Sequence, residues 1–241
     1  MIKIIYNGRL GNNLVQYAAG AILAEKTGLY LKTKAKRTFS KILNTQTING
    51  ACHVEAIELT DETYYAHYYN PEPNTGYILK GFFQDSRLLC DYRKQILDLY
   101  KLPEPKKSIS SDDVFIACRL GDLLTNVRYP RTYCSMKYIE DQLITSRDSC
   151  DNVYVTSDTI DHPPLVKLIK KYNLTVHQDS PINTILLAAQ FNNLILSAGS
   201  FSYWMAYLSS AENITVYHNN KQDPLQKQNA WDYNKNVKFI K

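Results

Sequence analysis

The sequence lacks several signatures that would place it in a common protein class. Its 241 residues contain no run of 18 consecutive apolar residues, so we expect no membrane-spanning helix. Its five cysteines are scattered and form no Cys-x-x-Cys pair, which argues against a zinc site and predicts free thiols in a reducing compartment. The glycine-rich signatures of P-loop nucleotidases, dinucleotide-binding dehydrogenases and α/β-hydrolases are also absent.

Charge is likewise modest and spread along the chain. The formal net charge of +5 fits an anionic small-molecule ligand, but the basic residues do not gather as they do in a nucleic-acid binder. We therefore expect no nucleic-acid partner. Tyrosine is abundant, with 19 residues, and its flat apolar face with a polar tip suits both core packing and sugar binding.

What is present is an alternation of short apolar runs with longer helical patterns, which is typical of parallel α/β sheets. Residues 34–75 show no clear pattern, and residues 102–108, which hold two prolines, are the best linker candidate. We predict two Rossmann-like domains that face each other, residues 1–105 and residues 106–241. In the second, strands are expected at residues 114–118, 152–156, 175–177, 194–196, 214–217 and 237–240, and helices at residues 133–146, 164–172, 181–190 and 201–209.

The first 28 residues are the most informative segment. Residues 2–6 are predicted to form a strand, residues 7–13 a glycine loop, and residues 14–26 a helix. The backbone N–H groups of such a loop and of the following helix N-terminus form a favourable seat for phosphate. We therefore predict ligand contacts from the loop residues Gly8, Arg9, Gly11, Asn12 and Asn13.

The same segment resembles a known family. Residues 9–18 read Arg-Leu-Gly-Asn-Asn-Leu-Val-Gln-Tyr-Ala, and Gly20 follows. They are similar to GGLGNQxFQYAxGxxLA, the N-terminal motif of the α-1,2-fucosyltransferases, which form glycosyltransferase family 11. The resemblance implies a two-domain fold of the GT-B type, and further matches continue in order to about residue 208.

The second match, residues 114–122, resembles the family's strand that ends in HxRRxD. It keeps the first arginine as Arg119 and the aspartate as Asp122. Ala117 and Leu120 stand in place of the histidine and the second arginine. An arginine at a strand end can direct two N–H groups onto a diphosphate, and the resemblance gives Arg119 that role. The alternative is an arginine that pairs with a surface acid.

Two further matches indicate donor-site residues. Residues 154–158 resemble the family's strand followed by F-S-D-D, where Ser157 and Asp158 could bind ribose or base, or cap the next helix. Residues 194–208 are similar to IISNSSFSWWAAxL, with Ala198 in place of the asparagine. At the start of the helix in this segment we expect donor contacts from Ser200, Phe201 and Ser202.

The catalytic base is the least defined part of the predicted site. A carboxylate must lie within hydrogen-bonding distance of the acceptor hydroxyl, unless a loose transition state needs no strong base. Asp122 is the first candidate, although it could instead orient Arg119 or bind nucleotide. Asp85 is the second. It belongs to residues 79–85, which resemble the family's GYxQSExYF segment, and it could equally cap a helix.

The sequence contains no Asp-x-Asp triplet, the usual seat for a divalent metal that carries a sugar nucleotide. Arginine, backbone N–H groups and helix ends must then meet the diphosphate charge, and we predict no metal requirement. The resemblance implies an inverting transferase that moves L-fucose from GDP-fucose onto a glycan hydroxyl, with no bound cofactor. The alternatives are another donor, such as a different GDP- or dTDP-deoxysugar, and a non-catalytic carbohydrate-binding module.

The chain enters a predicted strand at once, without the apolar region of a signal peptide. Animal relatives of the resembled family carry a membrane anchor. We therefore expect either a cytoplasmic enzyme or an excised domain.

Overall fold

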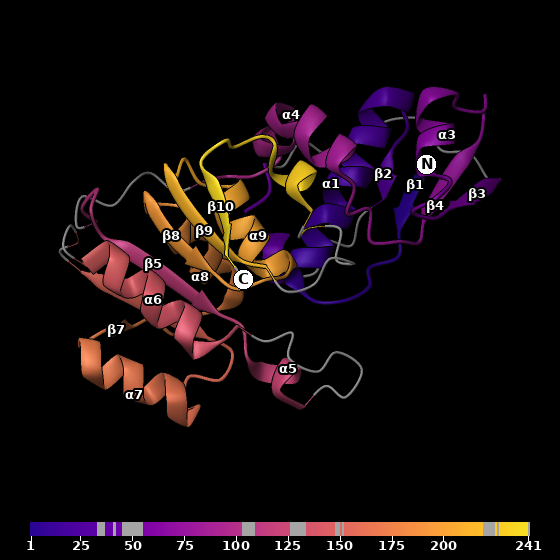
Figure 1. Cartoon of the computed structure of the whole chain (residues 1–241). Coiled ribbons are helices and arrows are strands. Elements are labelled where there is room, and N and C mark those ends of the chain that lie inside the picture. The colour runs from indigo at the N-terminus through magenta and orange to yellow at the C-terminus, as the bar shows by residue number, and fades with distance from the viewer. Residues whose placement is uncertain are drawn as a thin grey trace. The chain divides into compact units, whose positions relative to one another are not determined.

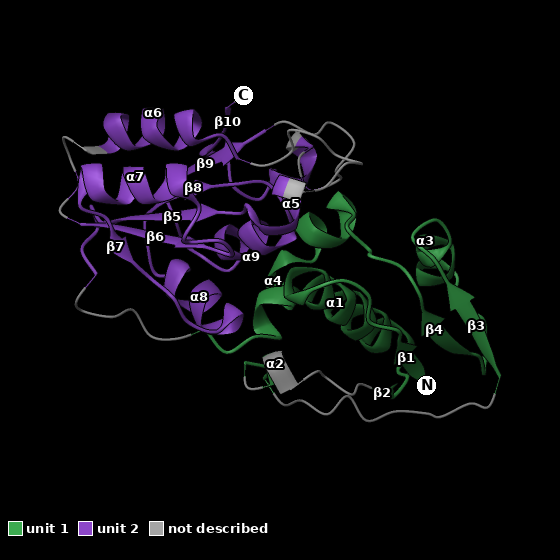
Figure 2. Cartoon of the chain, turned by 90° about the horizontal axis from the view of Figure 1, so that it is seen from below, with its two compact units in different colours: residues 1–102 green, residues 103–241 purple. Residues whose placement is uncertain are grey.

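The computed structural model describes residues 1–32, 37–40, 42–44, 55–102, 109–125, 134–147, 150, 152–218, 225 and 227–240. The chain divides into two compact units, Met1–Leu102 and Pro103–Lys241 (Figure 2). Each unit contains one parallel sheet, so the predicted α/β class is confirmed. The expected boundary after residue 105 lies outside the described residues, as does the linker beyond residue 102, and the roles given to the two domains stay predictions.

Unit 1 is built on a four-stranded sheet in the order β2-β1-β4-β3 (Figure 1). Helix α1 packs against β1 and is buried along most of its length. A side chain at Gly20 of this helix would place its Cβ 2.6 Å from Cδ1 of Ile4, so glycine permits the close approach of helix and sheet. The strands are β1 (Ile2–Ile4), β2 (Leu31–Lys32), β3 (Ala56–Leu59) and β4 (Gly76–Leu79), and the helices are α1 (Leu10–Thr27), α2 (Arg37–Ser40), α3 (Tyr64–Tyr69) and α4 (Arg93–Asp98).

Two helices of unit 1 differ from the sequence prediction. Helix α1 begins at Leu10 rather than at residue 14, so part of the predicted loop is its first turn. Asparagine is a poor helix former, but the side chain of Asn13 donates to the carbonyl of Asn7 at 3.0 Å, and this contact outweighs the local preference. The apolar residues of 86–99 fall on one face and predict one continuous helix, but the chain there forms a π-helical turn, Arg87–Asp91, followed by α4.

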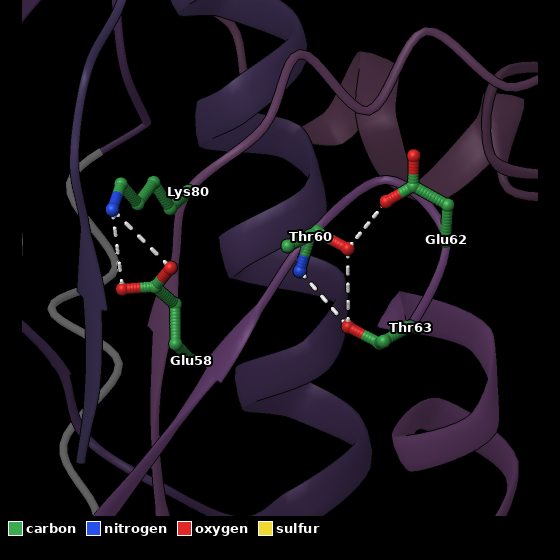
Figure 3. Close-up of polar contacts among 5 residues, drawn as sticks. All are labelled: Glu58, Thr60, Glu62, Thr63 and Lys80. Atoms are coloured by element: carbon green, nitrogen blue, oxygen red, sulfur yellow. Dashed lines mark hydrogen bonds and ion pairs between the residues drawn. The ribbon is translucent and has the colours of Figure 1, made fainter.

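The segment that showed no clear pattern contains β3 and α3. The turn between them is closed by Thr60, whose backbone N–H donates to Oγ1 of Thr63 at 2.9 Å and whose hydroxyl donates to Glu62 at 2.6 Å (Figure 3). Helix α3 then buries Tyr64, Tyr65 and Tyr68, and the hydroxyl of Tyr64 donates to the carbonyl of Ala19 in α1 at 2.8 Å. Here tyrosine serves core packing, the first of its two predicted uses.

Unit 2 is built on a six-stranded sheet in the order β10-β9-β8-β5-β6-β7, which is the Rossmann order. Each strand lies within one residue of its predicted ends. Helices α6 and α7 cover one face of the sheet, and α8 and α9 cover the other (Figure 1). The strands are β5 (Val114–Cys118), β6 (Val153–Ser157), β7 (Thr175–Val176), β8 (Asn193–Leu196), β9 (Asn213–Tyr217) and β10 (Val237–Ile240).

The helices of unit 2 include two that the sequence did not predict. These are the short α5 (Gly121–Thr125), directly after β5, and a 3-10 turn at Gln228–Trp231. The other helices are α6 (Met136–Arg147), α7 (Pro163–Tyr172), α8 (Pro181–Ala188) and α9 (Ser200–Tyr207). None of the helices in the described ranges has the length and apolarity needed to traverse a bilayer.

Candidate functional site

The strand order of unit 2 contains a switch point, the kind of position at which open α/β sheets bind ligands. From β5 the chain proceeds to β6 and β7 on one side, and it then returns to β8, β9 and β10 on the other. The loops after β5 and β8 therefore leave the sheet in opposite directions, and such a switch point opens a crevice at the carboxyl edge of a parallel sheet. Arg119 follows β5 and Ser197 follows β8, so two of the sequence matches meet at this point.

Arg119 occupies the switch point with a partly exposed guanidinium. Its side chain is 30% exposed, and Nη2 lies 3.2 and 3.3 Å from the two carboxylate oxygens of Asp122. The Nε atom is buried and has no hydrogen-bond partner among the described residues. The pair with Asp122 leaves a charged, forked donor at the edge of the sheet, where an anionic oxygen can be bound.

Ser197 joins the two loops of the switch point. Its Oγ accepts the backbone N–H of Arg119 at 2.9 Å and lies 3.3 Å from Oγ of Ser202. Ser202 is only 3% exposed, so its hydroxyl faces Ser197 and the interior, whereas Ser200 and Phe201 at the start of α9 are half-buried. The predicted donor contacts of Ser200 and Phe201 stay predictions, and the position of Ser202 fits a supporting contact to Ser197.

The Ser157–Asp158 pair does not cap α7, the next helix, which begins at Pro163 with His162 before it. The hydroxyl of Ser157 instead accepts the N–H of Thr159 at 3.0 Å. Oδ1 of Asp158 accepts the N–H groups of Leu120 and Gly121 at 2.8 and 3.0 Å. This carboxylate thus holds the start of α5, and the predicted contacts of the pair with ribose or base stay predictions.

The three departures from the family pattern are all buried. Ala117 is 3% exposed, Ala198 is 8% exposed, and Leu120 is fully buried. Leu120 belongs to the core cluster that β5 and β6 form with α6 and α7. An arginine could not occupy the position of Leu120 in this packing without burying its charge.

Unit 1 carries a second polar cluster, at the carboxyl ends of β1 and β4. Its centre is the fully buried Gln16 of α1, whose Oε1 accepts the N–H of Asn7 and the Nδ2 of Asn13, both at 3.2 Å. Nε2 of Gln16 donates to the carbonyl of Gly81 at 2.7 Å. One buried amide therefore ties the loop after β1 to the loop after β4. We did not predict a role for Gln16, although a glutamine among the apolar residues of a buried helix was a usable signal.

The residues of the glycine loop differ in their exposure to solvent. Gly8 and Arg9 are exposed, Asn12 is half-buried, and Gly11 and Asn13 are buried. Gly8 has a φ of +76°, and a Cβ on it would lie 2.2 Å from Nδ2 of Asn12, so glycine is required there. Since both the side chain and the backbone N–H of Asn13 donate to groups inside the loop, Asn13 has the geometry of a structural residue.

Asn12 is oriented by the loop after β4. Its Oδ1 accepts a hydrogen bond from Nε2 of Gln84 at 2.9 Å, which leaves the amide nitrogen of Asn12 beside Gly8. The same loop wraps the carboxylate of Asp61, which accepts the backbone N–H groups of Phe82 and Phe83. Phe83 has a φ of +55°, an unusual conformation for a bulky residue that the contact with Asp61 helps to hold.

Asp85, the second candidate base, is engaged with Arg87. Its Oδ1 accepts the backbone N–H of Arg87 at 2.8 Å, and its Oδ2 lies 2.7 Å from Nη2 of the same residue. Burial raises the pKa of Asp85, but the hydrogen bonds from Arg87 and its positive charge together lower the pKa by more. The pKa of Asp85 therefore lies below its ordinary value. A carboxylate held in this way is a weak base, and the geometry favours the helix-start alternative.

Within the described residues, no three His, Cys, Asp or Glu side chains gather in a way that could hold a metal ion. Among the described residues, Cys90, Cys118, Cys134 and Cys150 form no disulfide bond, in agreement with the predicted thiols, and Cys52 lies outside the described residues.

The geometry of both clusters comes from segments that match one sequence family. The sequence model of the family described as Glycosyl transferase family 11 matches residues 1–240. The chain belongs to glycosyltransferase family 11. It is therefore a glycosyltransferase, and its family was correctly predicted from the motifs. No curated protein sequence matches the chain.

Two solved structures are similar to this family 11 enzyme. A mutant of FUT1 from Arabidopsis thaliana, in complex with GDP, is similar over 92% of this chain and 71% of its own, with a TM-score of 0.60 and 11% identity. POFUT1 in complex with GDP is similar over 87% of this chain and 95% of its own, with a TM-score of 0.46 and 9% identity. The FUT1 similarity confirms the predicted two-sheet α/β architecture of the GT-B type.

Gly199, just before α9, provides a test of the site. It has a φ of +110° and a ψ of 164°, a region that only glycine readily occupies, and a Cβ there would lie 2.7 Å from Nη1 of Arg119. We expect Gly199→Ala to destabilise the enzyme by about 1–3 kcal/mol and to displace the guanidinium. Thermal unfolding and transferase rates measure the two effects.

The matched control is Gly28→Ala. Gly28 also has a positive φ, +66°, but no atom lies within 4 Å of a Cβ added there. If Gly199→Ala lowers the rate no more than Gly28→Ala does, the contact with Arg119 has no role in catalysis.

Proposed function

We propose that this family 11 enzyme transfers L-fucose from GDP-fucose onto a hydroxyl of a glycan, with inversion at the anomeric carbon and an α-1,2 linkage. The observation that carries the proposal is the guanidinium of Arg119, held at the switch point of a Rossmann sheet. Support also comes from the fold shared with FUT1, which was solved in complex with GDP.

In the proposed reaction, the acceptor oxygen attacks the anomeric carbon of fucose while the bond from that carbon to the diphosphate oxygen breaks. The bonding electron pair leaves with GDP, and the acceptor oxygen loses its proton. Negative charge therefore grows on the departing diphosphate, and Arg119 can stabilise it with a forked pair of N–H donors. No metal is needed in this scheme, which remains part of the proposal.

The proton acceptor in this proposal is Asp122 or solvent. The side chain of Asp122 is half exposed, so an acceptor hydroxyl could reach its carboxylate. In the structure this carboxylate pairs with Arg119. Binding of a diphosphate would compete for the same guanidinium, because both partners are anions. Asp122 would then be released for proton transfer, whereas in the unliganded site it orients Arg119.

A second donor is a specific alternative. Ala117, Leu120 and Ala198 depart from the family pattern in the strands and loops around Arg119, so a different GDP- or dTDP-deoxysugar could be the natural donor. The predicted contacts of Gly8, Arg9, Asn12, Ser157, Ser200 and Phe201 would then recognise that donor.

Thermal unfolding with GDP, UDP and dTDP distinguishes these donors. We expect GDP, at about 100 times its dissociation constant, to stabilise the enzyme by about 2.7 kcal/mol and to raise the Tm by roughly 5 °C. UDP and dTDP at the same concentration should raise it much less. Release of GDP from GDP-fucose, measured with and without glycan acceptors, then tests the transfer itself. Protection by dTDP with no effect of GDP would contradict the fucose assignment.

A further inference from the structure

Three consecutive backbone N–H groups follow β5, and side chains from the two neighbouring strands bind all three. The N–H of Arg119 donates to Oγ of Ser197, which follows β8. The N–H groups of Leu120 and Gly121 donate to Oδ1 of Asp158, which follows β6. Because β8 and β6 flank β5 on opposite sides, the turn that carries Arg119 is held from both sides.

We infer that Ser197 and Asp158 are positioning residues that hold the backbone of residues 119–121, and so set the guanidinium of Arg119 for the diphosphate. The inference rests on the proposed function, since it assigns Arg119 to the leaving group. Neither side chain needs to touch the substrate in order to act in this way.

The attachment of Ser197 is itself rigid. Its backbone N–H donates to the carbonyl of Ala117 at 2.9 Å, which extends the β5–β8 ladder by one bond. Its side chain is 2% exposed, and Oγ of the equally buried Ser202 lies 3.3 Å from its own Oγ. The hydroxyl of Ser197 can therefore accept from Arg119 and donate to Ser202, which uses its one donor and one of its two acceptor sites and restricts its orientation.

The approach of Asp158 depends on Gly121. A Cβ on Gly121 would lie 2.3 Å from Oδ2 of Asp158, so any other residue there would push the carboxylate away from the turn. This explains why a glycine stands between Leu120 and Asp122 in the motif, independently of any contact with a ligand.

The arrangement has a chemical consequence. Successive backbone N–H groups in a turn can form an anion-binding nest, but here each of the three already has an acceptor within the protein. These three N–H groups are therefore already engaged, and Arg119 can offer an anion its side chain rather than its backbone N–H. A displacement of about 1 Å in that side chain is enough to cost about 100-fold in rate, so small losses of backbone order should matter.

The test compares Ser197→Ala with a matched control, Ser209→Ala. Ser209 lies at the other end of α9, is also buried, and uses its hydroxyl to donate to the carbonyl of Ala206 at 2.7 Å and to accept from Ala211 at 3.2 Å. We expect Ser197→Ala to lower kcat/KM for the donor and the affinity for GDP about tenfold, because the guanidinium is misplaced. Ser209→Ala should change both by less than twofold, even though it lowers the Tm. Equal effects of the two variants would overturn the inference.

The same measurements in an Arg119→Ala background separate positioning from direct binding. If Ser197 and Asp158 act through Arg119, then adding Ser197→Ala or Asp158→Ala to Arg119→Ala should change GDP affinity by less than twofold. A direct nucleotide contact by Asp158 would instead persist in this background and would overturn its assignment as a positioning residue. Asp158→Asn keeps an oxygen that can accept both N–H groups, so it should restore most of the activity that Asp158→Ala loses.

Amide hydrogen exchange provides a readout that does not depend on the substrate. In the wild type the amide hydrogens of residues 119–121 should be protected from exchange. Ser197→Ala should speed the exchange of the Arg119 amide hydrogen. Asp158→Ala should speed the exchange of the amide hydrogens of Leu120 and Gly121. Unchanged protection in these variants would refute the inference even if GDP binds. Conversely, lost protection in an enzyme that does not bind GDP would support the held turn and refute only the proposed function.

Discussion

Replacing Arg119 by alanine should lower the rate of glycosyl transfer by about 10²–10³-fold while the enzyme stays folded. The side chain supplies the forked donor at the switch point, and no water molecule can reproduce both its charge and its geometry. Its removal should cost little stability, because its ion pair with Asp122 is partly solvated: the side chain of Arg119 is 30% exposed and that of Asp122 is 50% exposed. Initial rates with GDP-fucose and a glycan acceptor, together with a thermal melt, measure both effects.

Arg119→Lys is the informative control for this prediction. Lysine keeps the positive charge but loses the fork, so we expect activity between the wild type and the alanine variant. Acceptor binding should be nearly unchanged in both variants. Wild-type turnover by Arg119→Ala would show that another group stabilises the diphosphate, and it would remove the central residue of the proposal.

Replacing Leu120 by arginine should have the largest effect on stability. This change restores the residue that the family pattern has at this position, yet Leu120 is fully buried in the core between the sheet and helices α6 and α7. A guanidinium placed there would lose its hydration without gaining a carboxylate partner. We expect a loss of at least about 3 kcal/mol, or failure to fold.

Urea unfolding of Leu120→Arg beside Leu120→Met measures this cost. Methionine has a similar volume and no charge, so it should cost less than about 1.5 kcal/mol. If Leu120→Arg is as stable as Leu120→Met, the side chain at this position can reach solvent and the core assignment is wrong. A stable and more active Leu120→Arg enzyme would further indicate that the second arginine can still serve the site.

The sequence prediction was most accurate for segments whose local residue pattern matches their burial in the folded protein. Strand β5 was predicted with its observed ends because all five of its residues are apolar and all are buried on both faces of a covered sheet. Helix α3 was missed because four of its six residues are tyrosines, a residue type found both in cores and at surfaces: Tyr64, Tyr65 and Tyr68 are buried, whereas Tyr69 is exposed. The start of α1 was misplaced because partners of Asn13 in the loop, and not its own helix preference, decide its conformation.

The candidate site shows the same division. Arg119 and Asp122 could be named as candidates because their motif is continuous in sequence, and the structure places Nη2 of Arg119 3.2 Å from Oδ2 of Asp122. Their catalytic roles stay predictions. The supporting role of Asp158 could not be found in this way, since it binds Leu120 and Gly121 across 38 and 37 residues of chain. Gln16 and Ser197 were likewise missed as positioning residues, because the partners of each belong to a different loop.

The amino-acid sequence by itself determined the family, the parallel α/β class and, to within one residue, the ends of each strand of unit 2. It could do so because strand and helix periods and short motifs are properties of contiguous residues. Only the tertiary structure decided which strand ends become neighbours, and therefore that Ser197 and Asp158 close on Arg119 from opposite sides. The physical reason is that the order of strands in a sheet depends on the packing of distant segments, and a hydrogen bond between two loops exists only after that order is set.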